Sequence, residues 1–429
     1  MLKYFRRIKN RHYIILALSL VIFCCNQMCT TPHKNDDDAL IFDSYGQAFA
    51  GSAACQSCHA DIYKTHIGTA HYRDSRPAAA EYIKGSFDSG RNHFLYPNGT
   101  DVMMEHTKNG YFETAFRNGR EYTSKPIDIV IGSGRKGQSY LYWDEGKLFQ
   151  LPVSYFTPTD SWANSPGYSD DSAKFNRRIP ASCMECHGTY AKTLFLGQND
   201  LGDNFDKSQI IYGIDCEKCH GPGTEHIEYH KTHPGETVGK YIVNTGKLSR
   251  QQQLDACALC HSGSRYPMKP PFSFKAGDKL DEFSQAKYML DSVSTLDVHG
   301  NQYGLLTSSK CFKQSGMTCS SCHNTHVNEA GSTQLFSQRC MTCHNGIAHN
   351  TCKMPATPGL VLSANCIDCH MPTLPSHKIV LTLSELSRTI PNLVRTHRIA
   401  IYPESTKAYL KKLASFQSSR SIQPKVPGS

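Results

Sequence analysis

The sequence CEKCHGPGTEH, from Cys216 to His226, holds an ordered set of metal- and cofactor-binding side chains. Two cysteines stand three residues apart, a histidine follows the second directly, and another histidine comes six residues later. Two thiols and an imidazole in this order can hold zinc. They can also attach a haem covalently and place the adjacent histidine beneath its iron. The later histidine matters because an iron has two axial positions.

The Cys-x-x-Cys-His motif occurs seven times in the 429 residues and therefore predicts seven covalently bound haem c groups. The attachment residues are Cys55, Cys58, Cys183, Cys186, Cys216, Cys219, Cys257, Cys260, Cys319, Cys322, Cys340, Cys343, Cys366 and Cys369. The predicted proximal iron ligands are His59, His187, His220, His261, His323, His344 and His370. Zinc is the weaker interpretation, because zinc ribbons do not need a histidine after every cysteine pair.

The N-terminus resembles an export signal. Five basic residues precede an eleven-residue apolar run, Tyr13–Phe23, which suits a signal-peptide core better than a membrane span. Cys24 and Cys25 follow at once, as at the end of a bacterial lipoprotein signal. We expect lipidation at Cys25, with an ordinary cleaved signal or an uncleaved anchor as alternatives. The protein is then exported, periplasmic or associated with the outer membrane.

The net charge does not indicate nucleic-acid binding. The formal charge of +9 falls to +4 once the five basic residues before Tyr13 are removed. The propionates of seven haems would offset this remainder. No basic cluster with interleaved aromatic residues occurs, so we expect no nucleic-acid partner.

The motifs are unevenly distributed, and this predicts the fold class. Six of them lie between Cys183 and His370, which leaves little sequence for ordinary side-chain packing. We therefore expect a mainly α and irregular multihaem cytochrome c fold with a haem-packed core. A small antiparallel β element is expected to be inserted after the first motif.

The β element is predicted from hairpin turns. YPNGT, TKNGY, RNGRE and DEGKL separate apolar runs such as DVMMEH, YFETAF and SYLYW. The aromatic residues Tyr140, Tyr142, Trp143, Phe149 and Tyr155 are expected to form its core or to face a haem. A further helix is expected near Asp281–Ser292.

The expected segments follow from these features. They are a signal peptide (1–25), a tether (26–50), a first haem segment (51–87), a β-rich insert (88–157), a six-haem domain (158–380), a helical segment (381–416) and a disordered tail (417–429).

Several motifs resemble a known family. CQSCHADIYKTHIGTAHYRDSRPA, CEKCHGPGTEH, CSSCHNTH and CIDCHMP are similar to multihaem c-type cytochromes related to the tetrahaem electron acceptor of hydroxylamine oxidoreductase. The resemblance extends from about Ala53 to Ile399. It implies distal iron ligands at His71, His226, His326, His377 and His397, with His226 ligating a haem other than its own. His66 stands where many relatives carry Trp, and it is a rival to His71. His299 and His349 complete a set of seven by their positions near motifs.

Beyond the expected signal peptide and tether, two cysteines, Cys311 and Cys352, lie outside the motifs. In an oxidising compartment they could form a disulfide, and buried free thiols are the alternative.

Three functions agree with this sequence. The first is a carrier that passes single electrons along seven haems to redox partner proteins, either other cytochromes or a membrane quinol-oxidising complex. The second is a multihaem oxidoreductase acting on a small nitrogen or sulfur oxyanion at one open haem. The third is a docking module of a larger respiratory complex.

Overall fold

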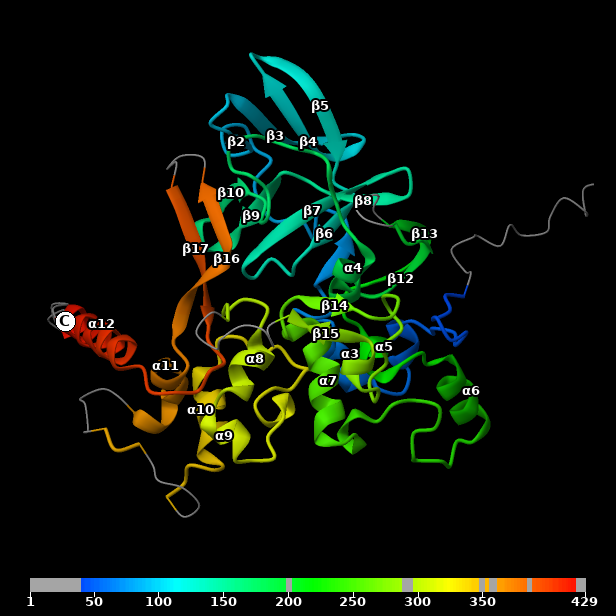
Figure 1. Ribbon diagram of the computed structural model, residues 1–429, viewed down its shortest axis with the longest axis vertical. Coiled ribbons are helices and arrows are strands. Elements are labelled where there is room, and N and C mark those ends of the chain that lie inside the picture. Colours follow the sequence, from blue (N-terminus) through cyan, green and yellow to red (C-terminus); the bar gives the residue numbers. More distant parts are fainter. Residues whose placement is uncertain are drawn as a thin grey trace, which may run out of the picture. The chain divides into compact units, whose positions relative to one another are not determined.

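The computed structural model describes residues 40–197, 203–287, 296–346, 352–354, 361–383 and 388–421. The chain divides into two units, and the description below concerns the unit Ile41–Ser429. Its sheets gather toward one end and most of its motif-bearing helices toward the other (Figure 1). Within the described residues, no helix is both long and apolar enough to span a bilayer.

Seventeen strands are present in the described residues. They are β1 (Ser75–Pro77), β2 (His93–Leu95), β3 (Thr100–Thr107), β4 (Gly110–Arg117), β5 (Arg120–Pro126), β6 (Ile129–Ile131), β7 (Gly137–Asp144), β8 (Lys147–Gln150), β9 (Val153–Phe156), β10 (Ser161–Asn164), β11 (Arg177–Arg178), β12 (Gly188–Phe195), β13 (Asn204–Tyr212), β14 (Arg265–Pro267), β15 (Ser284–Ala286), β16 (Thr373–Leu383) and β17 (Arg388–Arg395).

The largest sheet has nine strands in the order β1-β6-β7-β9-β10-β16-β17, with β8 paired to β7 and β11 paired to β8. A second sheet has the order β2-β3-β4-β5, and β12-β13 and β14-β15 form separate pairs. All the strand ladders are antiparallel.

The predicted hairpin turns are confirmed. The turn between β4 and β5 places Asn118 at φ 51° and Gly119 at φ 73°, and the turn between β7 and β8 places Glu145 at φ 46° and Gly146 at φ 76°. Two consecutive positive φ values are those of a type I′ turn, whose twist matches the strands that it joins. The Asn-Gly and Glu-Gly pairs therefore determine where these strands end.

The predicted aromatic core is also present. Tyr140, Tyr142 and Tyr155 are buried with Trp162 in one cluster, and Phe149 packs against it. Trp143 packs instead against a second cluster, which includes Met184 of the motif helix α4 (Ala181–His187). The sheets consequently have their own side-chain core, and the second cluster connects that core to a haem-attachment motif.

The helical elements are short. They are α2 (Ser52–Cys55), α3 (Ala60–His66), η2 (Thr157–Thr159), α4, α5 (Cys216–His220), α6 (Thr224–Thr232), η4 (Thr245–Lys247), α7 (Arg250–His261), η5 (Leu280–Glu282), α8 (Gln302–Thr307), α9 (Lys310–Lys313), η8 (Cys319–Ser321), α10 (Thr333–Met341), η9 (Leu362–Ala364), α11 (Cys366–His370) and α12 (Pro403–Ser421).

The expected fold class, mainly α and irregular with a small β insert, is wrong. Helix and strand take equal shares, and a nine-stranded antiparallel sheet dominates one part of the unit. Strands from outside 88–157 join this sheet: β1 precedes the expected insert, and β16 and β17 come from the far end of the chain. The prediction failed because strand pairing over long sequence separations leaves little local signal.

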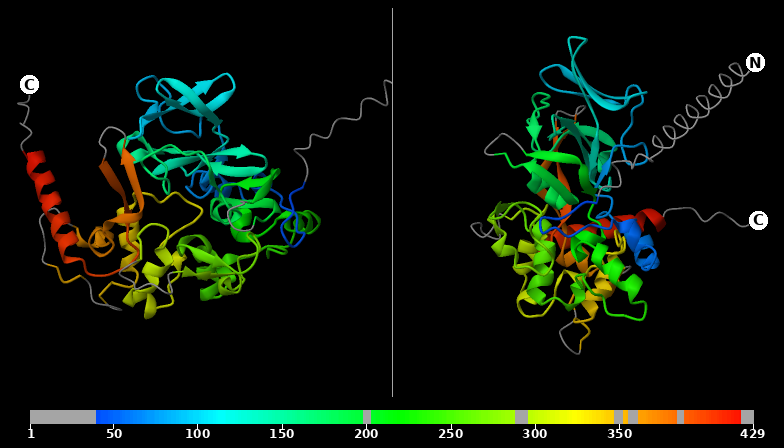
Figure 2. Two further views of the ribbon diagram at one scale, coloured as in Figure 1. Left: turned by 45° about the horizontal axis from the view of Figure 1, so that its top comes forward. Right: turned by 90° about the vertical axis from the view of Figure 1, so that its right-hand side faces the viewer.

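The expected helix over 381–416 is wrong for its first part. β16 and β17 form a hairpin there, and Leu383 pairs with Ala163 of β10. Pro391 is tolerated because β17 is an edge strand of the sheet. The helix α12 begins at Pro403, where the missing amide proton costs nothing, and it continues to Ser421 within the expected tail (Figure 2). The helix expected near 281–292 is wrong for the described residues up to 287, where β15 begins at Ser284, and the rest of that range lies outside the described residues.

Candidate haem-binding site

Each motif adopts helical geometry at its cysteine–histidine end. His59, His323 and His344 donate their backbone N–H to the carbonyl of the first motif cysteine, four residues earlier, at 2.9–3.0 Å. Residues i, i+3 and i+4 share one face of a helix. Both cysteines and the histidine of a motif therefore face the same side, as attachment to one porphyrin requires.

Three motif histidines face a second histidine. The ring centroids are 6.2 Å apart for His220 and His326, and 6.2 Å apart for His323 and His397. They are 6.0 Å apart for the third pair, His71 and His261. Two imidazoles on opposite sides of one iron stand about 6 Å apart, since each metal–nitrogen bond is about 2 Å long. His71, His326 and His397 thus stand at the separation from a motif histidine that two axial ligands of one iron would have.

Several motif histidines are held by hydrogen bonds at Nδ1. The Nδ1 of His220 lies 2.8 Å from the Val243 carbonyl oxygen, and that of His370 lies 2.9 Å from the Ala400 carbonyl oxygen. A histidine that donates from Nδ1 to an acceptor has Nε2 free to bind a metal. These rings are therefore oriented for iron ligation.

Two motif histidines have side-chain partners that the sequence analysis missed. Asp74 Oδ2 lies 2.7 Å from His187 Nδ1, and Gln302 Oε1 lies 3.3 Å from His261 Nδ1. Burial lowers the pKa of His187, but its hydrogen bond to Asp74 and the negative charge there raise it to a net value above the ordinary one. Asp74 is 113 residues away from His187, and no local motif indicates the contact.

His66 and His71, the two rival candidates for one distal position, differ in their contacts. His66 is buried, its ring is 6.1 Å from that of His326, and its Nε2 lies 3.2 Å from the Ile214 carbonyl oxygen. That contact occupies the nitrogen that would bind iron. The ring of His71 faces that of His261 instead.

Within the described residues, the ring that packs beside His226 is that of His230, which belongs to no motif. Its Nδ1 lies 2.8 Å from the Lys240 carbonyl oxygen, while the Nε2 of the neighbouring His230 accepts the Lys240 N–H at 3.4 Å. His226 thus keeps Nε2 available and His230 does not.

The other distal candidates are less well placed by the structure. His299 lies close enough to His187 and His261 for their charges to lower its pKa, although burial is the larger cause. His377 donates its backbone N–H to Asp297 Oδ2 at 2.5 Å. His349 lies outside the described residues, as does the expected lipidation site Cys25.

Cysteines from different motifs lie side by side in the unmodified polypeptide. Four pairs of thiols from different motifs lie close enough to shift each other's pKa: Cys55 and Cys216, Cys186 and Cys260, Cys257 and Cys319, and Cys340 and Cys366. In each pair the contact lowers the pKa of one thiol and raises that of the other. The first motif therefore adjoins the third, the fourth adjoins both the second and the fifth, and the sixth adjoins the seventh.

Cys311 and Cys352 are both free thiols in the structure. Burial raises the pKa of Cys311, and the nearby Cys343 thiol contributes. Cys352 is exposed, and its charge acts on Cys369. A disulfide between Cys311 and Cys352 remains a prediction.

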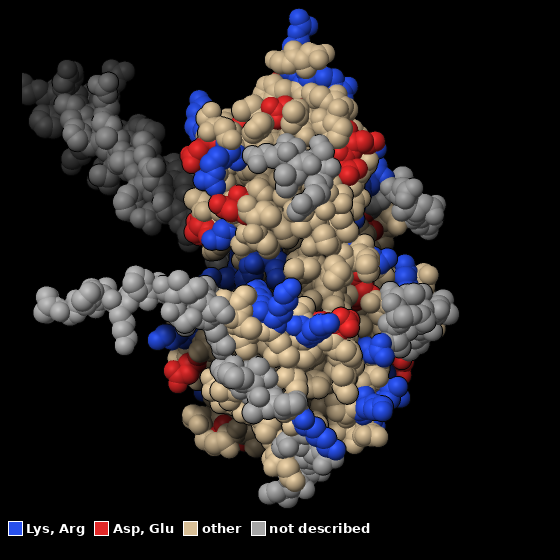
Figure 3. Space-filling model, turned by 90° about the vertical axis from the view of Figure 1, so that its left-hand side faces the viewer, with Lys and Arg blue, Asp and Glu red and all other residues tan. Residues whose placement is uncertain are grey.

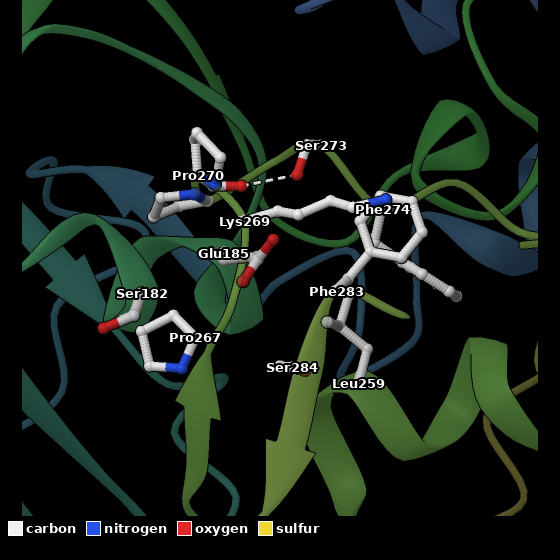
Figure 4. A pocket seen from close by; sticks show the side chains of 11 residues that line it. Ser182, Glu185, Leu259, Pro267, Lys269, Pro270, Ser273, Phe274, Phe283 and Ser284 are labelled. Carbon is white, nitrogen blue, oxygen red and sulfur yellow. Dashed lines mark hydrogen bonds between the residues drawn. The ribbon is translucent and has the colours of Figure 1, made fainter. Parts of the chain in front are cut away.

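The region between α5 and α11 fits large apolar cofactors. Its described residues contribute one buried cluster besides those of the sheets, formed by Ala258, Leu259 and Leu280. Five motifs lie in this stretch of the chain. A cavity of about 20 Å³ beside Glu185 and Leu259 has room for about one water molecule and none for an organic substrate (Figure 4). The residues present thus fit haem, because its apolar rings would supply the buried apolar surface that the side chains of this region do not.

Cationic side chains gather in the middle of one face of the molecule (Figure 3). Haem propionates are anionic, so Lys and Arg near the porphyrin edges would balance their charge.

Comparisons with known proteins agree with this site. The family model "Cytochrome c554 and c-prime" matches residues 158–221, which contain the second and third motifs. The multiheme cytochrome MtrA of Shewanella baltica (strain OS185) is 27% identical over 180 residues, which are 38% of this chain and 52% of MtrA. The chain thus matches about half the length of that relative.

The crystal structure of the outer cell wall cytochrome OcwA has a similar fold. Its TM-score is 0.52 at 17% sequence identity, and the alignment covers 84% of this chain and 81% of that one. Motifs, fold and partial sequence matches thus agree: the chain is similar to multihaem c-type cytochromes, and its motifs are those that attach haem c.

Proposed function

We propose that the protein is a heptahaem electron carrier of an exported respiratory chain. One observation carries this proposal. Three motif histidines, His220, His261 and His323, each face a second histidine at the separation expected of two axial ligands of one iron. An iron with imidazole on both sides exchanges electrons, while substrate chemistry needs an open position. At three irons, the geometry therefore favours electron transfer over catalysis.

The contacts between motifs support transfer along the chain of haems. The thiol of Cys257 meets that of Cys319, and Cys260 of the same motif meets Cys186. The haem of the fourth motif would therefore have its attachment edge next to those of two others. Short separations between cofactors are what electron hopping requires, and the protein contributes by orienting them.

The proposed distal ligands are His71, His226, His299, His326, His349, His377 and His397. Glu217 of the third motif accepts the backbone N–H groups of Ala50 and Gly51 at 2.8 and 2.9 Å, just before the first motif. Thr224, the first residue of α6, also donates its backbone N–H to the Ala48 carbonyl, so the start of the helix that carries His226 lies beside the segment before the first motif. We assign His226 to the iron beneath His59.

The experiment that tests the proposal combines haem counting with carbon monoxide binding. Intact mass and pyridine haemochrome absorbance of the mature protein should give seven haems, and five or fewer would reject the count. The reduced protein should bind no carbon monoxide. If one haem in a preparation with seven haems binds carbon monoxide, that haem has an open axial position. The proposal of an electron carrier is then rejected in favour of the enzyme alternative.

The proposed location is outside the cytoplasm, on a membrane surface through a lipidated Cys25. The basic and apolar start of the sequence supports this, as does the name of the structural relative OcwA, an outer cell wall cytochrome. Redox proteins in the same compartment, either cytochromes or a quinol-oxidising complex, would be the partners.

A further inference from the structure

Asp74 occupies a rigid position beside a motif histidine. It lies immediately before β1, its backbone carbonyl accepts the Gly132 N–H at 2.5 Å, and its own N–H donates to the His71 carbonyl at 3.1 Å. Its Oδ2 lies 2.7 Å from His187 Nδ1. Because β1 pairs with β6 inside the large sheet, this carboxylate is positioned by the sheet and not by the motif that it contacts.

The partner of His187 differs in charge from those of the other motif histidines with a defined Nδ1 contact. His220 and His370 face backbone carbonyls, and His261 faces the neutral amide of Gln302. Of these four described histidines, His187 alone faces a carboxylate. A carboxylate draws the Nδ1 proton more strongly than a carbonyl does, so it gives the imidazole more negative character.

More negative imidazole is a stronger electron donor to iron. Stronger donation stabilises ferric over ferrous iron, because the ferric ion carries the higher charge, and the reduction potential therefore falls. The residues His71–Asp74 affect two irons at once. His71 faces His261 of the fourth motif, while Asp74 bonds His187 of the second, and the Cys186 and Cys260 thiols touch.

We propose that Asp74 is a positioning residue that lowers the reduction potential of the haem attached at Cys183 and Cys186, below that of its neighbour at Cys257 and Cys260. The proposal rests on the proposed attachment of haem at both motifs. It makes this neighbouring pair asymmetric, so an electron shared between them resides mainly on the haem of the fourth motif.

The test uses the full mature protein and three variants. Asp74→Asn removes the carboxylate, Asp74→Glu keeps it, and Glu185→Gln removes a charge from the same motif without touching His187, because Glu185 bonds the Phe272 N–H. Intact mass first establishes that both haems are attached. A redox titration followed by NMR then gives each midpoint, and haem methyl groups are assigned by their proximity to Met184 for the second motif and Leu259 for the fourth.

The expected result is a selective shift. Asp74→Asn should raise the equilibrium constant for reducing the second-motif haem at least tenfold, which corresponds to a rise of about 59 mV in its one-electron midpoint potential. Glu185→Gln and Asp74→Glu should shift it less than threefold. Equal shifts in Asp74→Asn and Glu185→Gln, or no shift in Asp74→Asn, would overturn the proposal.

The proposal can also be tested on the wild-type protein, by comparing the midpoint potentials of the two haems, and this test does not depend on whether a variant folds. The haem at Cys183 and Cys186 must have a lower midpoint than the one at Cys257 and Cys260, and the reverse order rejects the proposal. A wild-type mass that lacks either haem rejects the heptahaem assignment itself, so the two failures are distinguishable.

Discussion

Replacing His326 by alanine should open one axial position at the iron beneath His220. The two imidazole rings are 6.2 Å apart and only 14° from parallel, so both can point a nitrogen at the same metal atom. Alanine has no group that can span this gap. Covalent attachment needs only the cysteines and the proximal histidine, so the number of haems should stay unchanged.

The size of the effect follows from the surroundings of His326. His66 is the other ring near it, at 6.1 Å, and its Nε2 is held by the Ile214 carbonyl. His66 therefore cannot move in as a substitute without breaking a buried hydrogen bond, at a cost of about 1–3 kcal/mol. We expect one carbon monoxide per reduced protein molecule, against none in the wild type. One haem equivalent should also leave the low-spin state.

The assay is a carbon monoxide titration of the reduced protein, with the spin state of the oxidised protein measured by electron paramagnetic resonance. His66→Ala is the matched control and should bind no carbon monoxide. His326→Met should stay closed but raise the potential of one haem. If His326→Ala binds none while His66→Ala binds one, the two histidines have been assigned the wrong way round.

Three further predictions follow from other parts of the molecule. His71→Ala should remove the most anisotropic low-spin resonance, because this ring lies 71° from its partner while the other two pairs lie at 14° and 28°; loss of a rhombic signal instead would contradict the pairing. Palmitate labelling should vanish in Cys25→Ala with haem content unchanged, and labelling lost only in Cys24→Ala would move the anchor by one residue. Burial raises the pKa of Glu113, which is fully buried with one carboxyl oxygen unpaired, well above its ordinary value. Between the pKa of Glu113 in the unfolded chain, roughly 4.3, and its higher pKa in the folded protein, only the folded protein keeps the Glu113 proton. The free energy of unfolding should therefore fall by about 1.4 kcal/mol for each pH unit in this range. Denaturant titrations from pH 5 to 7 should show this slope flattened in Glu113→Gln but not in the exposed control Glu121→Gln, and equal slopes in all three proteins would refute it.

The local chemistry of this protein could be predicted from its sequence. Thioether attachment and proximal ligation need residues within five positions of one another, so CEKCH is as informative in the sequence as it is in the folded chain. The same holds for hairpin turns, because the Asn118-Gly119 pair favours positive φ wherever it occurs. The sequence also indicates Tyr140 and Tyr155 as core residues, since large aromatic side chains between hairpin turns are typical of buried strands.

The tertiary structure decided what depends on distant segments. The nine-stranded sheet takes β16 and β17 from some 300 residues beyond β1, and antiparallel pairing leaves no trace in either segment alone. The second ligand of an iron is determined in the same way. The sequence favours His71 by resemblance and leaves His66 as a rival, and the contacts to the Ile214 carbonyl and to His261 that distinguish the two rings arise only on folding. Asp74 gave no signal at all, because a carboxylate acquires its role from the imidazole that folding places 2.7 Å away.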